Sequence, residues 1–335
     1  MHLNLRQLAA AICRLLLQCI PIVAGLALVL VDASAQSWPA KPIKIIVPVP
    51  PGQGADIITR LVAERLAMAL GQPVVVDNKP GAGTMVGSEA AAKSAPDGYT
   101  ILAAGSSALA INPHLYAKTS YNPLKDFTPI TQLVSIDFVL CVHPSLPVNS
   151  VRDLIRVARE RPDGLTYGST GNGTTNHLAM ALLASANSVK VTHVPYKGSV
   201  PAMTDLVGGQ ISMIAESVAV VMPHLRSSRI RPIGVMSLKR SPILPEIPTL
   251  DEQGQSGFAV STWTGLVAPA GTPSSILDRL NAETVKIIRM PDIQSRVRDL
   301  GMLAIGDSRE QFGTYIHAEY LKWASAVKAS GVRVE

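Results

Sequence analysis

A glycine-rich loop in the middle of the chain carries side chains that could bind an anion. It contains hydroxyl, amide and glycine residues and no charged group: Ser169, Thr170, Gly171, Asn172, Gly173, Thr174 and Thr175. The glycines allow close approach of the backbone, and an apolar helix is expected directly afterwards. Such a nest at a helix start could hold a carboxylate with two or three N–H or O–H donors. The same pattern is also typical of a plain turn with a Ser or Thr helix cap.

A second candidate anion site lies near the start of the chain, in residues 43–56. Ile43–Val47 is rich in β-branched residues, which predicts a buried strand. The prolines and glycines of residues 48–54 then forbid regular structure, and apolar residues recur at helical spacing after Asp56. A strand, a glycine loop and a helix start present N–H groups to the space above a sheet. This geometry suits an anion without a basic side chain.

The elements that must position these loops alternate between strands and helices. Strands are expected at residues 43–47, 74–76, 100–104, 137–142, 165–167, 189–194, 211–215 and 230–236. The helical patterns between them imply βαβ units and a mostly parallel sheet. Three further helices are expected near the C-terminus, at residues 274–290, 292–300 and 309–329.

Two strands, residues 138–142 and 261–267, are predicted to cross between two domains. The first domain would then be discontinuous and consist of residues 36–138 and 258–335, and the second would consist of residues 139–257. Ligands of such α/β folds bind at the carboxyl ends of the strands. Four loops are expected to meet there, at residues 49–56, 105–108, 168–175 and 216–218.

The N-terminus has the pattern of a secretory signal peptide of residues 1–35. Arg6 and Arg14 precede an apolar run, and the small residues 33–35 match the usual cleavage pattern. A membrane anchor is the alternative for a run of this length. Pro21 interrupts the run, however, and the small residues at its end favour cleavage near Ala35.

Charge and cysteine content exclude several classes of protein. Removal of residues 1–35 takes two arginines and one aspartate from the 30 basic and 24 acidic residues, which leaves a net charge of +5. These charges are scattered and only 4% of the residues are aromatic, which argues against nucleic-acid binding. Cys141 is the single cysteine beyond residue 35, so that part of the chain can form no internal disulfide. The seven histidines lack metal-binding spacing, so neither a metal site nor a cofactor is expected.

Motifs along nearly the whole chain resemble those of one family. They include PVPPGQGAD at 48–56, QPVVVDNKPGAG at 72–83, YGSTGNGTTNHLA at 167–179, HVPYKGSVPAMTDLVGGQ at 193–210 and WTGLVAPAGTP at 263–273. In their order and spacing the chain closely resembles the substrate-binding receptors of tripartite tricarboxylate transporters, often called Bug receptors. The resemblance implies a type II periplasmic-binding-protein fold, in which two α/β lobes with mostly parallel sheets are joined by two crossing strands.

The resemblance also implies a function. A receptor of this kind would capture a small organic acid in the cleft between its lobes and deliver it to the permease subunits of a tripartite tricarboxylate transporter. The ligand could be a di- or tricarboxylate, an acidic amino acid or an aromatic carboxylate. The protein is expected to be a monomer in the periplasm and not an enzyme. A ligand sensor that reports to the sensor kinase of a two-component system is the alternative function.

The resemblance assigns further residues to the ligand site. In the family, the residues that match Pro50, Gly52 and their neighbours hold ordered waters that bridge to a ligand carboxyl group. Gln53 lies in the same loop, where the family usually has glycine. Ser106 and Ser107 match the segment that meets the ligand from the first domain.

Two acidic residues stand beside these segments. Asp56 matches an acidic residue of the family and is expected to cap the first helix. Glu216 stands where the family often has aspartate, and it would either favour a ligand with an amine or hydroxyl or point away toward another partner. A bare carboxylate beside an anionic ligand is costly, so Glu216 must be paired, neutral or facing a donor.

A hydrolase is the main alternative from another functional class. Ser106, Ser107 and Ser169 follow predicted strands, where a nucleophile could lie. The chain nevertheless lacks a G-x-S-x-G elbow, and no histidine stands in a recognisable triad context. The glycine loop also lacks the Gly-Lys-Ser/Thr ending of a P-loop. The residues therefore favour a binding protein.

Overall fold

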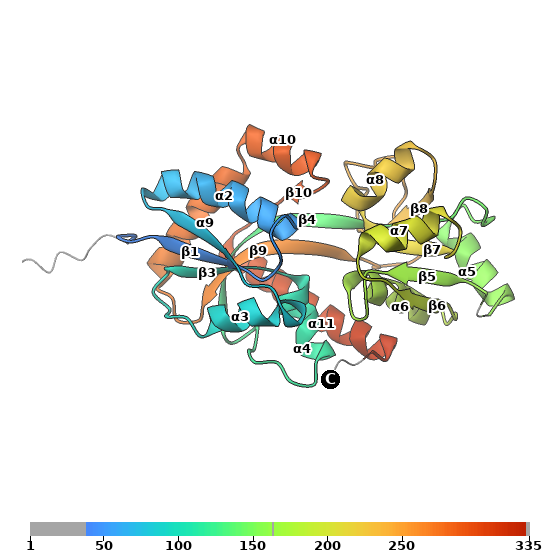
Figure 1. Ribbon diagram of the computed structural model, residues 1–335, viewed down its shortest axis with the longest axis horizontal. Coiled ribbons are helices and arrows are strands. Elements are labelled where there is room, and N and C mark those ends of the chain that lie inside the picture. The colour runs from blue at the N-terminus through green and yellow to red at the C-terminus, as the bar shows by residue number, and fades with distance from the viewer. Residues whose placement is uncertain (1–37, 163, 333–335) are drawn as a thin grey trace, which may run out of the picture. The chain divides into compact units, whose positions relative to one another are not determined.

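The computed structural model describes residues 38–162 and 164–332, and the helices and strands described lie in the compact unit that begins at Lys41 (Figure 1). The predicted signal peptide lies outside the described residues. Within the described part of the chain, no helix combines the length and apolar character that a membrane span requires.

Ten strands and ten α-helices are described. The strands are β1 (Ile43–Val47), β2 (Val74–Asn78), β3 (Thr100–Gly105), β4 (Phe127–Val142), β5 (Thr166–Ser169), β6 (Thr192–Pro195), β7 (Met213–Ser217), β8 (Arg231–Val235), β9 (Ser261–Pro269) and β10 (Leu303–Ala304). The helices are α2 (Gly54–Leu70), α3 (Met85–Ala92), α4 (Asn112–Leu115), α5 (Val151–Glu160), α6 (Thr175–Ala186), α7 (Ser199–Val207), α8 (Val218–Arg226), α9 (Ser274–Ile288), α10 (Pro291–Asp299) and α11 (Arg309–Ser330). Two short helices of other types, the 3₁₀-helix η1 (Ala82–Thr84) and the π-helix η2 (Ser107–Ile111), precede α3 and α4.

The strands are paired in the order β2-β1-β3-β9-β4-β7-β5-β6, and β8 and β10 pair with β4 beside this path. β1 is parallel to both β2 and β3, and β5 is parallel to both β6 and β7. Between these two parallel groups, β9 and β4 run antiparallel to their neighbours. The predicted α/β fold is therefore confirmed, and the antiparallel strands lie where the two groups are joined.

β4 and β9 form the predicted crossing (Figure 1). Residues 127–137 of β4 pair with β9, whereas residues 138–142 pair with β7 and β8. The chain returns through Val260, whose N–H donates to the Met236 carbonyl at 2.7 Å, directly before β9 begins. β4 starts well before the predicted strand. The prediction missed its first half because the polar residues Thr131 and Gln132 interrupt the apolar pattern, although both side chains are buried.

Helix α11 contributes to two hydrophobic cores. Phe312 packs with Trp263 in the core beside β3 and β9, with their ring centroids 5.6 Å apart. Trp323 packs with Leu140 in the core of the second group of strands. The predicted C-terminal helix is therefore present, and it extends along the junction between the two groups of strands.

Glu319 connects these two cores. Its carboxylate accepts the indole N–H of Trp263 at 3.2 Å and that of Trp323 at 3.1 Å, and it forms an ion pair with Lys322. Glu319 is only 5% exposed. Since buried N–H groups that lack an acceptor are costly, this carboxylate stabilises the junction.

Replacement of Glu319 by alanine should lower the free energy of unfolding by about 3 kcal/mol, because two indole N–H groups lose their acceptor. Urea denaturation followed by tryptophan fluorescence would measure the change. Glu64 is exposed on α2 and provides a control, since Glu64→Ala should change the free energy of unfolding by less than about 0.5 kcal/mol. Equal stability of the two variants would contradict the bridging role of Glu319.

Candidate ligand-binding site

A cavity of about 230 Å³ lies at the carboxyl ends of β1 and β3 and the start of β9. No charged side chain lines it. The lining residues are Pro48, Val49, Gln53, Gly54, Ala55, Thr84, Ala103, Gly105, Ser106, Ser107, Ala108, Ile136, Thr262, Trp263 and Thr264. Backbone N–H groups and hydroxyls are therefore the main hydrogen-bond donors at its wall.

The start of α2 faces this cavity with uncapped N–H groups. Gln53 is the N-cap residue, and its side chain makes no capping hydrogen bond. Gly54 and Ala55 occupy the first helical positions and line the cavity. Because the first N–H groups of a helix have no partner inside the helix, they remain available to an anion.

Asp56 fixes the loop that leads to this helix start. Its carboxylate accepts the N–H of Gly52 at 2.8 Å, Arg60 Nε at 3.0 Å and Asn78 Nδ2 at 2.9 Å. Burial alone would raise the pKa of Asp56, but these hydrogen bonds outweigh burial and lower the pKa below its usual value. Asp56 therefore does not cap the helix as predicted: it is the third residue of α2 and binds the N–H of Gly52, which precedes the N-cap residue, so it fixes the loop before the helix.

The loop after β3 forms the opposite wall. Ser106 is buried, and its Oγ lies 3.0 Å from Thr262 Oγ1 on β9. A Cβ on Gly105 would lie 2.1 Å from the Trp263 carbonyl oxygen. Only glycine therefore fits at Gly105, and the close approach of β3 to β9 brings the two hydroxyls together.

The predicted residues of the first domain are brought together in part. Gln53, Ser106 and Ser107 line the cavity. Pro50 and Gly52 are exposed and do not line it. The N–H of Gly52 is hydrogen-bonded to the Asp56 carboxylate instead. The residues on either side of Pro50 and Gly52 in this loop line the cavity.

The predicted glycine loop after β5 is not part of this lining. Three of its hydroxyls are used inside the protein. Ser169 Oγ donates to the Gly171 carbonyl at 3.0 Å, Thr174 Oγ1 donates to the same carbonyl at 2.8 Å, and Thr170 Oγ1 donates to Asn176 Oδ1 at 2.8 Å. The side chains that were expected to face a ligand therefore shape the loop.

The remaining residues of this loop differ in exposure. Asn172 is exposed, whereas Thr175 is buried where α6 begins. Gly173 has a φ of +72° and lies against α4, where an added Cβ would come within 2.3 Å of Leu115 Cδ2. The loop therefore touches the segment that follows Ser107 without entering the cavity.

Glu216 is buried and has two donors. Its carboxylate accepts Ser199 Oγ at 2.8 Å and the N–H of Ser217 at 2.7 Å. Glu216 does not line the cavity. The sequence left two roles open for Glu216: to favour a ligand with an amine or hydroxyl, or to point toward another partner. The geometry matches the second role, since the carboxylate is turned toward partners within the protein.

Two stacked histidines form hydrogen bonds with the glycine loop 169–175. The rings of His177 and His193 are 3.8 Å apart and nearly parallel, and Tyr167 lies next to His193 with a centroid distance of 4.9 Å. His177 Nδ1 accepts the N–H of Gly173 at 3.1 Å, and His193 Nε2 lies 2.7 Å from Ser169 Oγ. Burial lowers the pKa of both histidines, and the neighbouring His193 helps to lower that of His177 to about 4.

The contact between Ser169 and His193 resembles a hydrolytic pair only in its distance. Ser169 is fully buried, and its hydroxyl proton is directed to the Gly171 carbonyl. His193 Nε2–H therefore donates to Ser169, whereas a general base must accept the serine proton. This geometry does not activate Ser169 as a nucleophile.

Several lining residues were not predicted from the sequence. Thr84 follows the glycines of the PGAG motif, and Thr262 and Thr264 lie at the start of the predicted crossing strand. Their hydroxyl groups were the available signal. Their positions depend on the pairing of β3 with β9 and on the packing of η1, which local patterns do not reveal.

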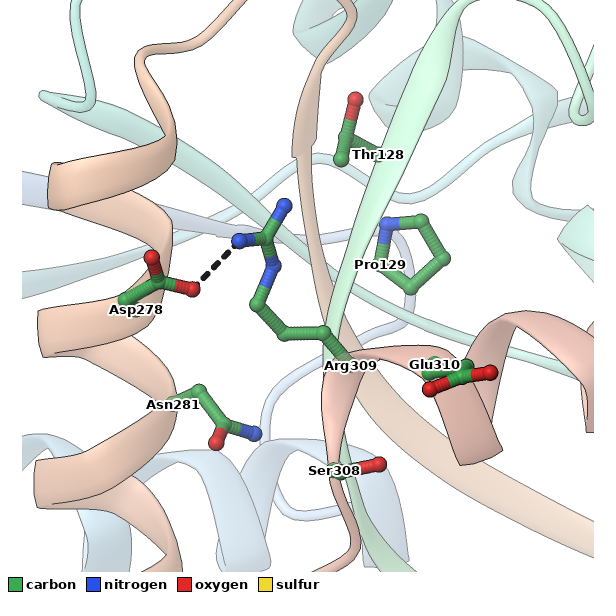
Figure 2. Close-up of a pocket in the computed structure, with 7 residues that line it drawn as sticks. All are labelled: Thr128, Pro129, Asp278, Asn281, Ser308, Arg309 and Glu310. Carbon is green, nitrogen blue, oxygen red and sulfur yellow. Dashed lines mark hydrogen bonds and ion pairs between the residues drawn. The ribbon is translucent and has the colours of Figure 1, made fainter.

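A second hollow of about 480 Å³ lies where α9 meets the start of α11 (Figure 2). Arg309 points toward Asp278, with Nη1 and Oδ1 2.5 Å apart. Asn281 Nδ2 donates to the carbonyls of Ile130 at 2.7 Å and Asp307 at 2.9 Å. These contacts attach α11 to α9 and β4, so we assign them a structural role.

Comparison with known proteins identifies one family. Residues 58–332 match the tripartite tricarboxylate transporter family receptor. The chain belongs to this family. Protein BugT of Bordetella pertussis is 34% identical to this receptor over 303 residues, which cover 90% of this chain and 93% of BugT. The predicted family membership is therefore confirmed.

Two solved structures from Rhodopseudomonas palustris are similar to the receptor. Rpa4515 with adipate has a TM-score of 0.75 and 34% identity, and the match covers 88% of this chain and 99% of that protein. MatC with bound malate has a TM-score of 0.72 and 29% identity, with coverage of 87% and 100%. These similarities confirm the predicted periplasmic-binding-protein fold.

The histidine pair predicts a loss of stability in mild acid. Both pKa values are lowered in the folded state, so the unfolded state binds more protons once the pH falls below about 6.5. The free energy of unfolding should therefore decrease as the pH falls from about 6.5 toward 4, and His177 should account for about 2 kcal/mol of this decrease at pH 4.5.

Urea titrations between pH 7.5 and 4.5 would test this prediction with two matched variants. His177→Gln should flatten the pH dependence, whereas replacement of the exposed His317 by glutamine should leave it unchanged. Parallel curves for His177→Gln and the wild type would show that His177 does not contribute.

Proposed function

We propose that this receptor captures a small dicarboxylate in the periplasm and delivers it to the permease subunits of a tripartite tricarboxylate transporter. The observation that carries the proposal is the cavity of about 230 Å³, which offers donors and no acidic side chain. Uncapped N–H groups at the start of α2 lie on one side, and the Ser106 and Thr262 hydroxyls lie on the other. Oriented N–H and O–H donors stabilise a carboxylate without a basic partner.

The same lining favours a dicarboxylate over an acidic amino acid. A buried ammonium group needs an anionic or strongly polar acceptor. No carboxylate lines the cavity, and each carboxylate oxygen of Glu216 already accepts a hydrogen bond within the protein, from Ser199 or from Ser217. The malate held by MatC and the adipate held by Rpa4515 are both dicarboxylates, which supports the same class here.

Capture would proceed by closure of the two predicted domains. Residues 36–138 and 258–335 would form one lobe, residues 139–257 the other, and the chain around Val260 and the middle of β4 would serve as the hinge. In this proposal the glycine loop 169–175 meets the ligand through the first N–H groups of α6, which have no partner inside that helix. Three of the loop's four hydroxyls and the N–H groups of Gly171, Gly173 and Thr174 already have partners within the protein. Residues 1–35 would direct secretion and be removed near Ala35.

Replacement of Gly54 by proline tests the donor role of α2. Proline is tolerated at the first position of a helix but removes the N–H that would reach the ligand. Gly54→Pro should weaken dicarboxylate binding by at least tenfold, or about 1.4 kcal/mol, with little change in stability. Isothermal titration calorimetry would be carried out with malate, adipate, succinate, citrate, glutamate and benzoate.

Gly54→Ala is the matched control, because it keeps the N–H and its Cβ would meet only the flexible end of Met302. Equal affinities of the proline and alanine variants would place the ligand carboxylate away from α2. Absence of binding by the wild type across the whole panel would contradict carboxylate capture. Tighter binding of glutamate than of the dicarboxylates would contradict the proposed ligand class.

A further inference from the structure

Thr84 lies at the cavity wall in a conformation that residues with side chains rarely adopt. Its φ is +87° and its ψ is −6°. Glycine would adopt this conformation freely, whereas a β-branched residue pays a conformational cost there. Strain of this kind persists only where the surroundings enforce it, and it is concentrated at functional sites.

Two buried side chains enforce the conformation of Thr84. Ser88 Oγ donates to the Thr84 carbonyl at 2.9 Å. Asn112 Nδ2 donates to the Gly83 carbonyl at 2.6 Å and to Thr84 Oγ1 at 3.2 Å. Ser88 is fully buried, and Asn112 is 3% exposed. Thr84 is therefore held in this conformation by hydrogen bonds to its carbonyl and its hydroxyl oxygen.

These contacts make the Thr84 hydroxyl oxygen an acceptor and leave its own proton available. The Gly83 carbonyl only accepts, so the atom of Asn112 that faces it must be the amide nitrogen. An amide nitrogen only donates, and Thr84 Oγ1 must therefore accept from it and keep its own proton. Thr84 is the N-cap residue of α3, yet its side chain makes no capping hydrogen bond. Among the hydrogen bonds of the described residues, none uses this proton.

We propose that Thr84 is a ligand-contacting residue that donates its hydroxyl proton to a ligand carboxylate and thereby contributes to specificity. The inference rests on the proposed function and adds a third donor to the α2 start and the Ser106–Thr262 pair. It also accounts for threonine at a position where glycine would be less strained, because the hydroxyl is the group that glycine lacks.

Three substitutions separate the hydroxyl from the strain. Thr84→Gly removes both, Thr84→Val removes the hydroxyl and keeps the β-branch, and Thr84→Ser keeps the hydroxyl. Calorimetry would use the dicarboxylate that binds the wild type most tightly among malate, adipate and succinate. We expect the glycine and valine variants to bind at least tenfold more weakly, and the serine variant to stay within threefold of the wild type.

Thermal unfolding without ligand provides the second measurement. Thr84→Gly should keep or raise the melting temperature, because relief of strain offsets the lost contact with Asn112. Ser228 also has a positive φ, of +52°, in an exposed turn outside the cavity lining. Ser228→Gly should therefore leave the affinity unchanged, which controls for relief of strain alone.

The outcomes separate this inference from the proposed function. Wild-type affinity in both Thr84→Gly and Thr84→Val would overturn the ligand contact while leaving dicarboxylate capture intact. A clear fall in the melting temperature of Thr84→Gly, with weaker binding in the serine variant as well, would show that Thr84 has a structural role only. A wild type that binds none of the three dicarboxylates would contradict the proposed ligand class itself.

Discussion

The pairing of β4 with two groups of strands is the constraint on which the rest of the structure depends. Residues 127–137 hold β9 in register, and residues 138–142 hold β7 and β8. Because β9 also pairs with β3, its first residues come opposite the end of β3, where Gly105 lies directly against the Trp263 carbonyl. This register brings Ser106 to Thr262 and closes one wall of the cavity. The candidate ligand-binding cavity is therefore a consequence of strand pairing between segments far apart in the sequence.

The carboxylate of Asp56 fixes the loop at the start of α2 without lining the cavity. Asp56 is buried beside the loop before α2, and its ion pair with Arg60 compensates its charge. It binds the N–H of Gly52, whereas Gly54 and Ala55, whose N–H groups have no partner inside the helix, lie at the cavity wall. A cavity with donors but no formal charge attracts an anion through local dipoles. Such attraction has a short range and a defined direction, so it selects for the position of a carboxylate more than for total charge.

The sequence predicted the features that depend on local patterns. The strands, the C-terminal helices and the glycine loops follow from hydrophobic spacing and backbone freedom, and family motifs identified the type of fold. The first half of β4 was missed because Thr131 and Gln132 are polar yet buried. The orientation of Glu216 depends on Ser199, and the exposure of Thr84 to the cavity depends on Asn112. A sequence reveals that hydroxyls are present, but only the folded arrangement determines where their protons point.

One short segment connects the cavity with the glycine loop 169–175. η2 and α4 follow one another along residues 107–115, and Ser107 at the start of η2 lines the cavity. Asn112 supports Thr84, and Leu115 lies against Gly173 in the glycine loop of the second group of strands. The glycine loop is fixed in turn by His177 and His193. Since each contact is buried or constrained by a left-handed glycine, the loops have little freedom to rearrange individually. A ligand that shifts Ser107 would therefore act on Thr84 and Gly173 through the same segment.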